Sequence, residues 1–180
     1  MDSKLFEKDV ERKTVFKGAV FDIDSATVEL PDGTLGRRDV MCHPSGVGVL
    51  PVDDQLYVYM VRQFRYGASN VLLEIPAGKL NYGEDPVVCG KRELSEETGL
   101  VCNELISLGE LYPTPAISNE KIYIYLARSF ASGERHLDKD EFLNVEKIHF
   151  TDLYNMVLNN EITDAKTQIA VLKAYRLLNL

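Results

Sequence analysis

The most regular pattern of hydrophobic and polar positions lies just before the middle of the chain. Small and apolar residues recur there at spacings of three and four, at Val87, Gly90 and Leu94. This period is typical of a helix that packs one face against a sheet. Asp85 followed by Pro86 is the pattern of an N-cap and a first helical residue, and Gly99 is a typical helix end. The sequence therefore predicts a helix over residues 86–98.

Runs rich in β-branched and aromatic residues predict strands in much of the remaining chain. The expected strands cover residues 15–23, 26–30, 35–42, 47–52, 55–65, 71–75, 104–111, 121–128 and about 145–150. We expect residues 47–52 and 55–65 to form a hairpin. Residues 1–13 are expected to be a short helix or a frayed end. Two further helices are predicted, one over 151–159 capped by Thr151 or Asp152 and a final one capped by Thr163.

The order of these elements predicts two parts. The first strands form a small antiparallel sheet in an N-terminal arm, residues 1–43, which is too small to bury a core alone. We expect it to pack on the main domain or on a second subunit. Strands and helices then intermix over residues 44–180, which predicts an α+β fold with a mixed sheet between helices.

Composition and charge narrow the classes of function. The 180 residues are 45% hydrophobic and 27% charged, as in a soluble globular protein of about one domain. A net charge of −8 argues against non-specific binding to nucleic acid. No apolar run approaches the roughly 20 residues of a membrane span, and the N-terminus lacks the apolar core of a signal peptide. We therefore expect a cytoplasmic protein with neither a nucleic acid nor a membrane as partner.

The predicted helix at 86–98 carries a crowded set of carboxylates. Glu93, Glu96 and Glu97 recur at helical spacing, and like charges at that spacing cost about 0.2–0.5 kcal/mol per pair. Arg92, four residues before Glu96, can offset one of them. Hard oxygen ligands from successive turns suit magnesium or manganese, whereas the alternative is an ordinary solvated acidic face. The loop before the helix contains Gly78 and Gly83, which allow tight backbone turns. This glycine loop next to the carboxylates favours a functional site over a solvated acidic face.

These residues resemble the signature of the Nudix hydrolases. The signature has a glycine, five residues, a glutamate, seven residues, and then Arg-Glu-aliphatic-x-Glu-Glu-x-Gly-aliphatic. It is matched without departure by Gly78, Glu84, Arg92, Glu93, Leu94, Glu96, Glu97, Gly99 and Leu100. The resemblance implies an α/β/α sandwich with a mixed sheet. It also implies that Glu84 and Arg92 brace the loop and helix.

The same resemblance implies the cofactor and its ligands. Glu93, Glu96 and Glu97, with the main-chain carbonyl of Ala77, are expected to hold two or three Mg²⁺ ions, with Mn²⁺ as an alternative. Such ions neutralise a diphosphate and activate a water for its hydrolysis. The expected catalytic residues are these three glutamates and a general base.

Other segments resemble the ADP-ribose pyrophosphatases within this superfamily. They are GRRDVMCHPSGVGVLPV, VRQFRYG, LLEIPAGKL, YPTPAISNEKIYIYLA and LDKDEFLNVEKI. Pro115 stands fifteen residues beyond Leu100, as in the loop that marks this group, but Ala116 replaces a usual glycine. The resemblance implies hydrolysis of ADP-ribose to AMP and ribose 5-phosphate. The alternatives are a diphosphatase for another nucleoside diphosphate sugar, or a non-catalytic ligand sensor.

Substrate-binding residues are expected outside the signature. Arg65 ends a strand beside the glycine loop, where a guanidinium suits a diphosphate, although strand arginines are more often edge charges. In relatives the general base comes from a mobile loop after the helix. Here Glu141 is the first choice, Asp138 and Asp140 are the alternatives, and an ordinary polar loop is the competing interpretation.

The resemblance also implies a homodimer in which the N-terminal sheet is exchanged between subunits. Arg37, Arg38 or Asp39 of one subunit would then reach the substrate of the other. The sequence alone indicates a charged strand edge for this segment.

Overall fold

The structure is a computed structural model that describes residues 3–180, and these form two compact units. The first unit contains the chain up to Pro44 together with Tyr112–Lys121. The second contains Ser45–Leu111 and Ile122–Leu180. The 112–121 loop therefore belongs to the same unit as the N-terminal strands, although about seventy residues separate them in sequence.

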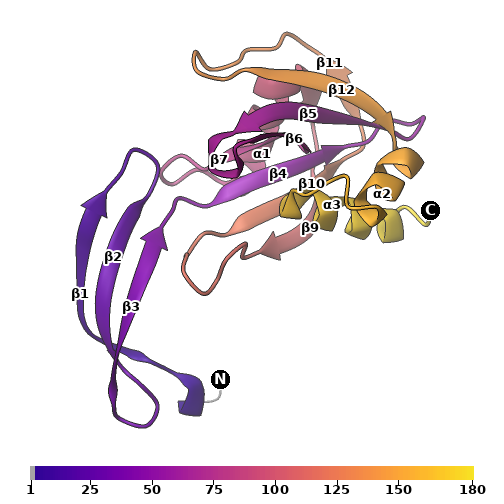
Figure 1. The fold of residues 1–180 in the computed structure, drawn as a ribbon. Coiled ribbons are helices and arrows are strands. Elements are labelled where there is room, and N and C mark those ends of the chain that lie inside the picture. The colour runs from indigo at the N-terminus through magenta and orange to yellow at the C-terminus, as the bar shows by residue number, and fades with distance from the viewer. Residues whose placement is uncertain (1–2) are drawn as a thin grey trace. The chain divides into compact units, whose positions relative to one another are not determined.

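The first unit is built on a three-stranded antiparallel sheet in the order β1-β2-β3 (Figure 1). Its elements are a 3₁₀ turn at Ser3–Leu5, β1 at Lys8–Lys17, β2 at Asp22–Glu29 and β3 at Leu35–Cys42. The expected small antiparallel sheet is confirmed, but the expectation of a helix or frayed end over residues 1–13 is wrong from Lys8 onward. The strand expected at 15–23 is interrupted by a turn, where the amide of Gly18 donates to the carbonyl of Phe21 at 3.1 Å.

The 112–121 loop lies along β3 within the first unit. The amide of Met41 donates to the carbonyl of Ile117 at 2.8 Å, and the amide of Asn119 donates back to the carbonyl of Met41 at 3.2 Å. Ala116, which replaces a usual glycine, is not among the described residues with positive φ. Alanine therefore does not strain this loop.

The second unit contains the remaining strands and the three α-helices found within residues 3–180 (Figure 1). The strands are β4 Gly46–Pro51, β5 Tyr57–Arg65, β6 Asn70–Glu74, β7 Ala77–Lys79, β8 Leu100–Cys102, β9 Ile106–Leu111, β10 Ile122–Ala127, β11 Phe130–Ser132 and β12 Leu143–His149. A 3₁₀ turn covers Tyr66–Ala68, and the helices are α1 Pro86–Thr98, α2 Phe150–Leu158 and α3 Ala165–Leu177. The sheets have the orders β7-β4-β10-β9, β12-β5-β6 and β11-β8.

The expected hairpin between β4 and β5 is wrong. β4 pairs in parallel with β10 and antiparallel with β7, whereas β5 pairs with β6 and β12. An isolated bridge joins Val52, the residue after β4, to Val58 of β5. Every residue of β4 is buried, which is typical of a central strand covered on both faces rather than of a hairpin arm.

The two faces of β4 and β10 contribute to two hydrophobic clusters. Leu50 and Leu126 belong to a cluster with Phe150 of α2 and Ala170 of α3. Val49 belongs to a second cluster, which contains the α1 residues Cys89 and Leu94. The mixed sheet therefore lies between α1 on one face and α2 with α3 on the other. The predicted α/β/α arrangement is confirmed.

Helix boundaries follow the capping residues. The predicted helix at 86–98 is confirmed, since the Asp85 side chain accepts from the amides of Val87 and Val88 and Gly99 has φ +72°. The predicted caps of the other two helices are wrong, because His149 caps α2 and Asp164 caps α3. Within residues 3–180, no helix has the length and apolar character needed to cross a membrane.

Candidate active site

The loop before α1 is shaped by its contacts with the helix carboxylates. β7 pairs with β4, which brings Gly78 opposite Val47 and anchors the loop to the central sheet. The amide of Ala77 donates to Glu97 Oε2 at 3.0 Å. A Cβ added to Gly78 would fall 2.0 Å from Glu93 Cδ. Only glycine lets the loop backbone approach the Glu93 carboxylate this closely.

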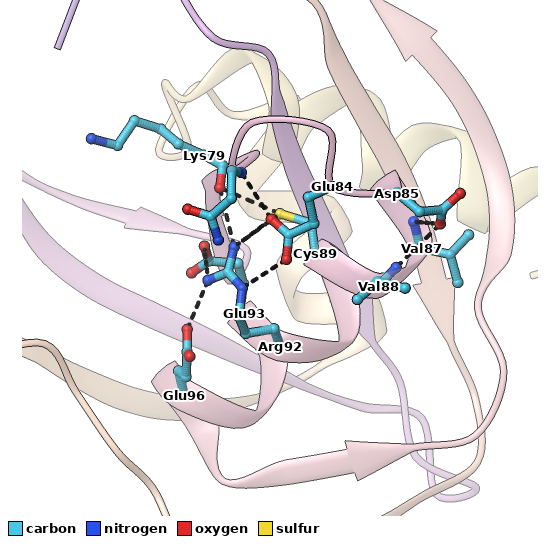
Figure 2. A network of polar contacts seen from close by, with 10 residues as sticks. Lys79, Glu84, Asp85, Val87, Val88, Cys89, Arg92, Glu93 and Glu96 are labelled. Atoms are coloured by element: carbon cyan, nitrogen blue, oxygen red, sulfur yellow. Dashed lines mark hydrogen bonds and ion pairs between the residues drawn. The ribbon is translucent and has the colours of Figure 1, made fainter.

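Arg92 is the centre of a polar network between the glycine loop and α1 (Figure 2). Its Nε and Nη2 donate to the two carboxylate oxygens of Glu84 at 2.9 and 3.0 Å. Its Nη1 donates to Glu93 at 2.6 Å and to Glu96 at 2.9 Å, and Nη2 also reaches the carbonyl of Lys79 at 3.2 Å. The guanidinium therefore joins the loop to two successive turns of α1.

Glu84 closes the loop as well as pairing with Arg92. Its carboxylate accepts from the amide of Asn81 at 2.9 Å, and its own amide donates to the carbonyl of Asn81 at 3.0 Å. The Arg92 guanidinium lowers the pKa of Glu84 to about 2. Glu84 is thus ionised at neutral pH, and the geometry agrees with the expected bracing role of this pair.

Two carboxylates of α1 are buried beneath the loop. Glu93 and Glu97 are buried, and Glu97 has an exposed fraction of only 1%. Burial raises the pKa of Glu93, and burial together with the neighbouring Glu93 and Glu141 raises the pKa of Glu97 to about 8. Arg92 contacts Glu93 and Glu96, whereas Glu97 receives the Ala77 amide. The site is therefore rich in carboxylate relative to the positive charge that contacts it.

This donor set fits a hard divalent cation, because its side chains offer only oxygen and the single Arg92 guanidinium is shared by Glu84, Glu93 and Glu96. Among residues 3–180, however, no three His, Cys, Asp or Glu side chains are already grouped as metal ligands. The reason is local, since Glu93 and Glu96 both point to Arg92 Nη1 while Glu97 accepts from Ala77. The ligand roles of Ala77, Glu93, Glu96 and Glu97 stay a prediction.

The candidate general base lies in the turn before β12. The amide of Glu141 donates to the carbonyl of Asp138 at 3.1 Å, and the Glu141 side chain accepts from the Asp138 amide at 3.4 Å. The charge of Glu141 is one of the causes that raise the pKa of Glu93 and of Glu97. Glu141 therefore lies within electrostatic reach of both buried glutamates. Its catalytic role, and those of the alternatives Asp138 and Asp140, stay predictions.

Arg65 is held by the buried Glu74, a partner that the sequence analysis did not predict. Its Nε and Nη2 donate to the two carboxylate oxygens of Glu74 at 2.7 and 3.0 Å. Glu74 also accepts from Lys166 of α3. The nearby charge of Arg65 lowers the pKa of Glu97, against the larger effect of burial. The sequence signal was Glu74, which follows directly on the apolar residues 71–73 of β6.

The other expected substrate residues lie in the first unit. Arg37 on β3 donates to Ser25 Oγ at 2.9 Å, and Arg38 Nε donates to Glu7 at 2.9 Å. Asp39 is opposite Ser25 in the β2–β3 register, and Pro115 lies in the turn of the 112–121 loop. Their contacts with a substrate stay predictions.

Comparisons with known proteins place this geometry in a family. The chain matches the NUDIX domain over residues 43–170. It is 38% identical over 169 residues to the ADP-ribose pyrophosphatase of Bacillus subtilis (strain 168), covering 93% of this chain and 91% of that protein. It is 36% identical over 171 residues to the methanol dehydrogenase activator of Bacillus methanolicus, with coverage of 93% and 92%. The crystal structure of an ADP compounds hydrolase superposes with a TM-score of 0.86 at 21% identity, covering 97% of this chain and 96% of that one.

Proposed function

We propose that this protein, which belongs to the NUDIX domain family, hydrolyses the diphosphate of ADP-ribose to AMP and ribose 5-phosphate with the help of magnesium. The observation that carries the proposal is the pair of buried carboxylates, Glu93 and Glu97, packed beneath a glycine loop. The 38% identity to an ADP-ribose pyrophosphatase across nearly the whole chain supports this substrate.

The chemistry follows from the inertness of a diphosphate. Its anionic oxygens repel a nucleophile, so hydrolysis requires charge neutralisation and an activated water. Glu93, Glu96 and Glu97, with the carbonyl of Ala77, would hold two or three Mg²⁺ or Mn²⁺ ions. Such ions supply a Lewis acid for the phosphates and lower the pKa of a bound water. The raised pKa values of Glu93 and Glu97 support this assignment, because a cation there would stabilise their charged forms.

Two side chains outside α1 complete the proposed reaction. Arg65 holds the diphosphate from the edge of its guanidinium that Glu74 does not occupy. Glu141 accepts the proton of the attacking water at its carboxylate. The electrostatic effect of Glu141 on Glu93 and Glu97 supports this choice over Asp138 and Asp140.

We propose that the protein forms a homodimer and that the N-terminal sheet of one subunit helps to bind the nucleoside of the substrate in the other. β1 is exposed along its whole length, with Val10, Val15 and Phe16 each more than half exposed. A three-stranded sheet with so little covered surface favours pairing with a second subunit. The residues that would then contribute to nucleoside binding are Arg37, Arg38, Asp39 and Pro115. We expect the protein to act in the cytoplasm. Light scattering on the purified protein tests the dimer, and a monomeric mass at micromolar concentration would exclude it.

The decisive experiment offers the purified protein a panel of nucleoside diphosphate sugars with magnesium and separates the products by chromatography. We expect AMP and ribose 5-phosphate from ADP-ribose at the highest kcat/KM. Faster cleavage of another member would favour the alternative diphosphatase, because the signature residues would contact only the diphosphate and the metals and do not determine the sugar or the nucleoside. Binding of ADP-ribose without cleavage of any member would favour the ligand sensor. Omission of magnesium and chelation with EDTA provide the matched controls for the cofactor.

A further inference from the structure

We propose that Glu74 and Lys166 are positioning residues, which fix the guanidinium of Arg65 in the orientation that grips the substrate diphosphate. The inference rests on the proposed function, in which Arg65 is the diphosphate clamp. It assigns a role in substrate binding to the C-terminal helix α3, which lies far from the signature in sequence.

The contacts form a continuous chain from α3 to Arg65. Lys166 Nζ donates to Glu74 and, at 2.9 Å, to Asp164 Oδ1. Glu74 in turn accepts hydrogen bonds from Nε and Nη2 of Arg65. The exposed fractions are 11% for the Lys166 side chain, 1% for Glu74 and 39% for Arg65. The buried carboxylate therefore holds the inner edge of an arginine whose remaining surface is open to a ligand.

The first turn of α3 is also tied to the beginning of the glycine loop. Thr167 Oγ1 accepts from the amide of Ile75 at 2.9 Å and donates to Asp164 Oδ2 at 2.6 Å. Thr167 and Ile75 are both fully buried. One helical turn thus sets the position of Glu74 through Lys166 and that of the next residue through Thr167.

Lys166 is an unusual residue for its place. A lysine in the first turn of a helix is disfavoured by the helix dipole, and a buried ammonium is disfavoured by desolvation. Glu74 and Asp164 offset both effects. Glu74 contacts both Lys166 and Arg65, and its two hydrogen bonds to Arg65 keep the guanidinium in one plane.

A second arginine–glutamate pair on β5 provides the matched control. Arg62 makes a two-bond pair with Glu146 of β12, and its side chain is 39% exposed, as that of Arg65 is. Glu146, however, is 36% exposed, and Glu74 is buried. An exposed partner that can rearrange in water does not fix an arginine as a buried one does. Glu146→Gln should therefore leave ADP-ribose kinetics within about twofold of the wild type.

The test compares Glu74→Gln, Lys166→Met and Glu146→Gln, each with and without Arg65→Ala, in ADP-ribose hydrolysis at saturating magnesium. We expect Glu74→Gln to raise KM about tenfold and Lys166→Met about threefold, with kcat within threefold, because a substrate-binding contact is lost. In the Arg65→Ala background, neither substitution should raise KM further. A KM equal to that of Glu146→Gln, or the same increase without Arg65, would overturn the inference. If Glu74→Gln does not fold, Lys166→Met decides.

A second readout separates this inference from the proposed function. The Arg65 Nε–H cross-peak in an NMR spectrum, assigned by its loss in Arg65→Lys, reports the bond to Glu74 without any substrate. We expect the peak to shift in Glu74→Gln and in Lys166→Met and to stay in place in Glu146→Gln. An unchanged peak in both test variants would contradict the positioning. A wild type that leaves ADP-ribose intact would overturn the function, and the NMR result would still stand or fall by itself.

Discussion

The α-carbon of Gly78 lies directly against the carboxyl group of Glu93, so that a methyl group at residue 78 would fall 2.0 Å from Glu93 Cδ. This contact explains why a glycine stands in β7 although its φ is not positive. The requirement is a close approach between the loop backbone and the Glu93 side chain, not a special turn. A side chain larger than that of glycine at residue 78 would have to displace the buried Glu93 carboxylate, which Arg92 Nη1 contacts at 2.6 Å.

Gly78→Ala should therefore reduce activity without unfolding the protein. The new methyl group would displace the Glu93 carboxylate from the site, and we expect kcat to fall by about 100-fold or more. The free energy of unfolding should fall by about 1–3 kcal/mol, because displacing the buried carboxylate also breaks its hydrogen bond with Arg92. Steady-state kinetics and urea unfolding on the same preparation measure both quantities.

Gly83→Ala provides the opposite control. Gly83 has φ +75° and no atom lies within 4 Å of its hypothetical Cβ. Alanine there should lower the free energy of unfolding by about 1 kcal/mol through backbone strain, with kcat within a few-fold of the wild type. Equal losses of kcat in Gly78→Ala and Gly83→Ala would show that loop strain, not the Glu93 contact, is responsible.

Glu84→Gln should weaken the fold in a pH-dependent way. The folded-state pKa of about 2 lies below the ordinary value of 4.5, so this carboxylate adds stability above about pH 4.5 and loses it as the pH falls toward 2. At pH 7 we expect the variant to be less stable by about 1–3 kcal/mol, as for other hydrogen bonds to charged groups. Urea unfolding from pH 7 to pH 3 should show the difference shrinking, with exposed Glu104→Gln as the control. A difference that is constant with pH would exclude the ion pair as its cause.

The local part of the fold could be predicted from the sequence, and the long-range pairing could not. The ends of α1 follow from Asp85, Pro86 and Gly99, which act within one turn of the chain. The partner of β4 does not, because its apolar run fits a hairpin and a central parallel strand equally well. The parallel pairing with β10 connects residues more than seventy positions apart, so no local turn sequence between the two strands indicates that they pair.

The candidate site divides in the same way. Helical spacing predicted the pairing of Arg92 with Glu96, and the family resemblance implied the bracing by Glu84, because these residues lie on one helix and its preceding loop. The partner of Arg65 was missed, since Glu74 reaches it through the antiparallel pairing of β5 with β6 and reaches Lys166 through the packing of α3. A glutamate directly after the apolar residues 71–73 was the sequence signal of that buried pair.

Glu97→Gln tests the proposed metal site with little disturbance of the fold. The glutamine oxygen can still accept from the amide of Ala77, and burial already disfavours the charged form of Glu97. We expect stability at least equal to that of the wild type in the absence of metal, but a fall in kcat of about 100-fold or more. Turnover like that of the wild type would remove Glu97 from the proposed ligands. Calorimetric titration with manganese should show weaker binding in the variant, independently of turnover.

Glu141→Gln tests the choice of general base against its neighbours Asp138 and Asp140. The amide preserves the size of the side chain and its ability to accept from the Asp138 amide, so the turn should be retained. Loss of a general base lowers kcat by about 10²–10⁴-fold, whereas Asp138→Asn and Asp140→Asn should stay within about threefold. The KM for ADP-ribose should change little in all three variants, since none removes a proposed substrate contact. If Asp138→Asn or Asp140→Asn instead carries the large loss, the base is that residue, and the electrostatic effect of Glu141 on Glu93 and Glu97 is incidental to catalysis.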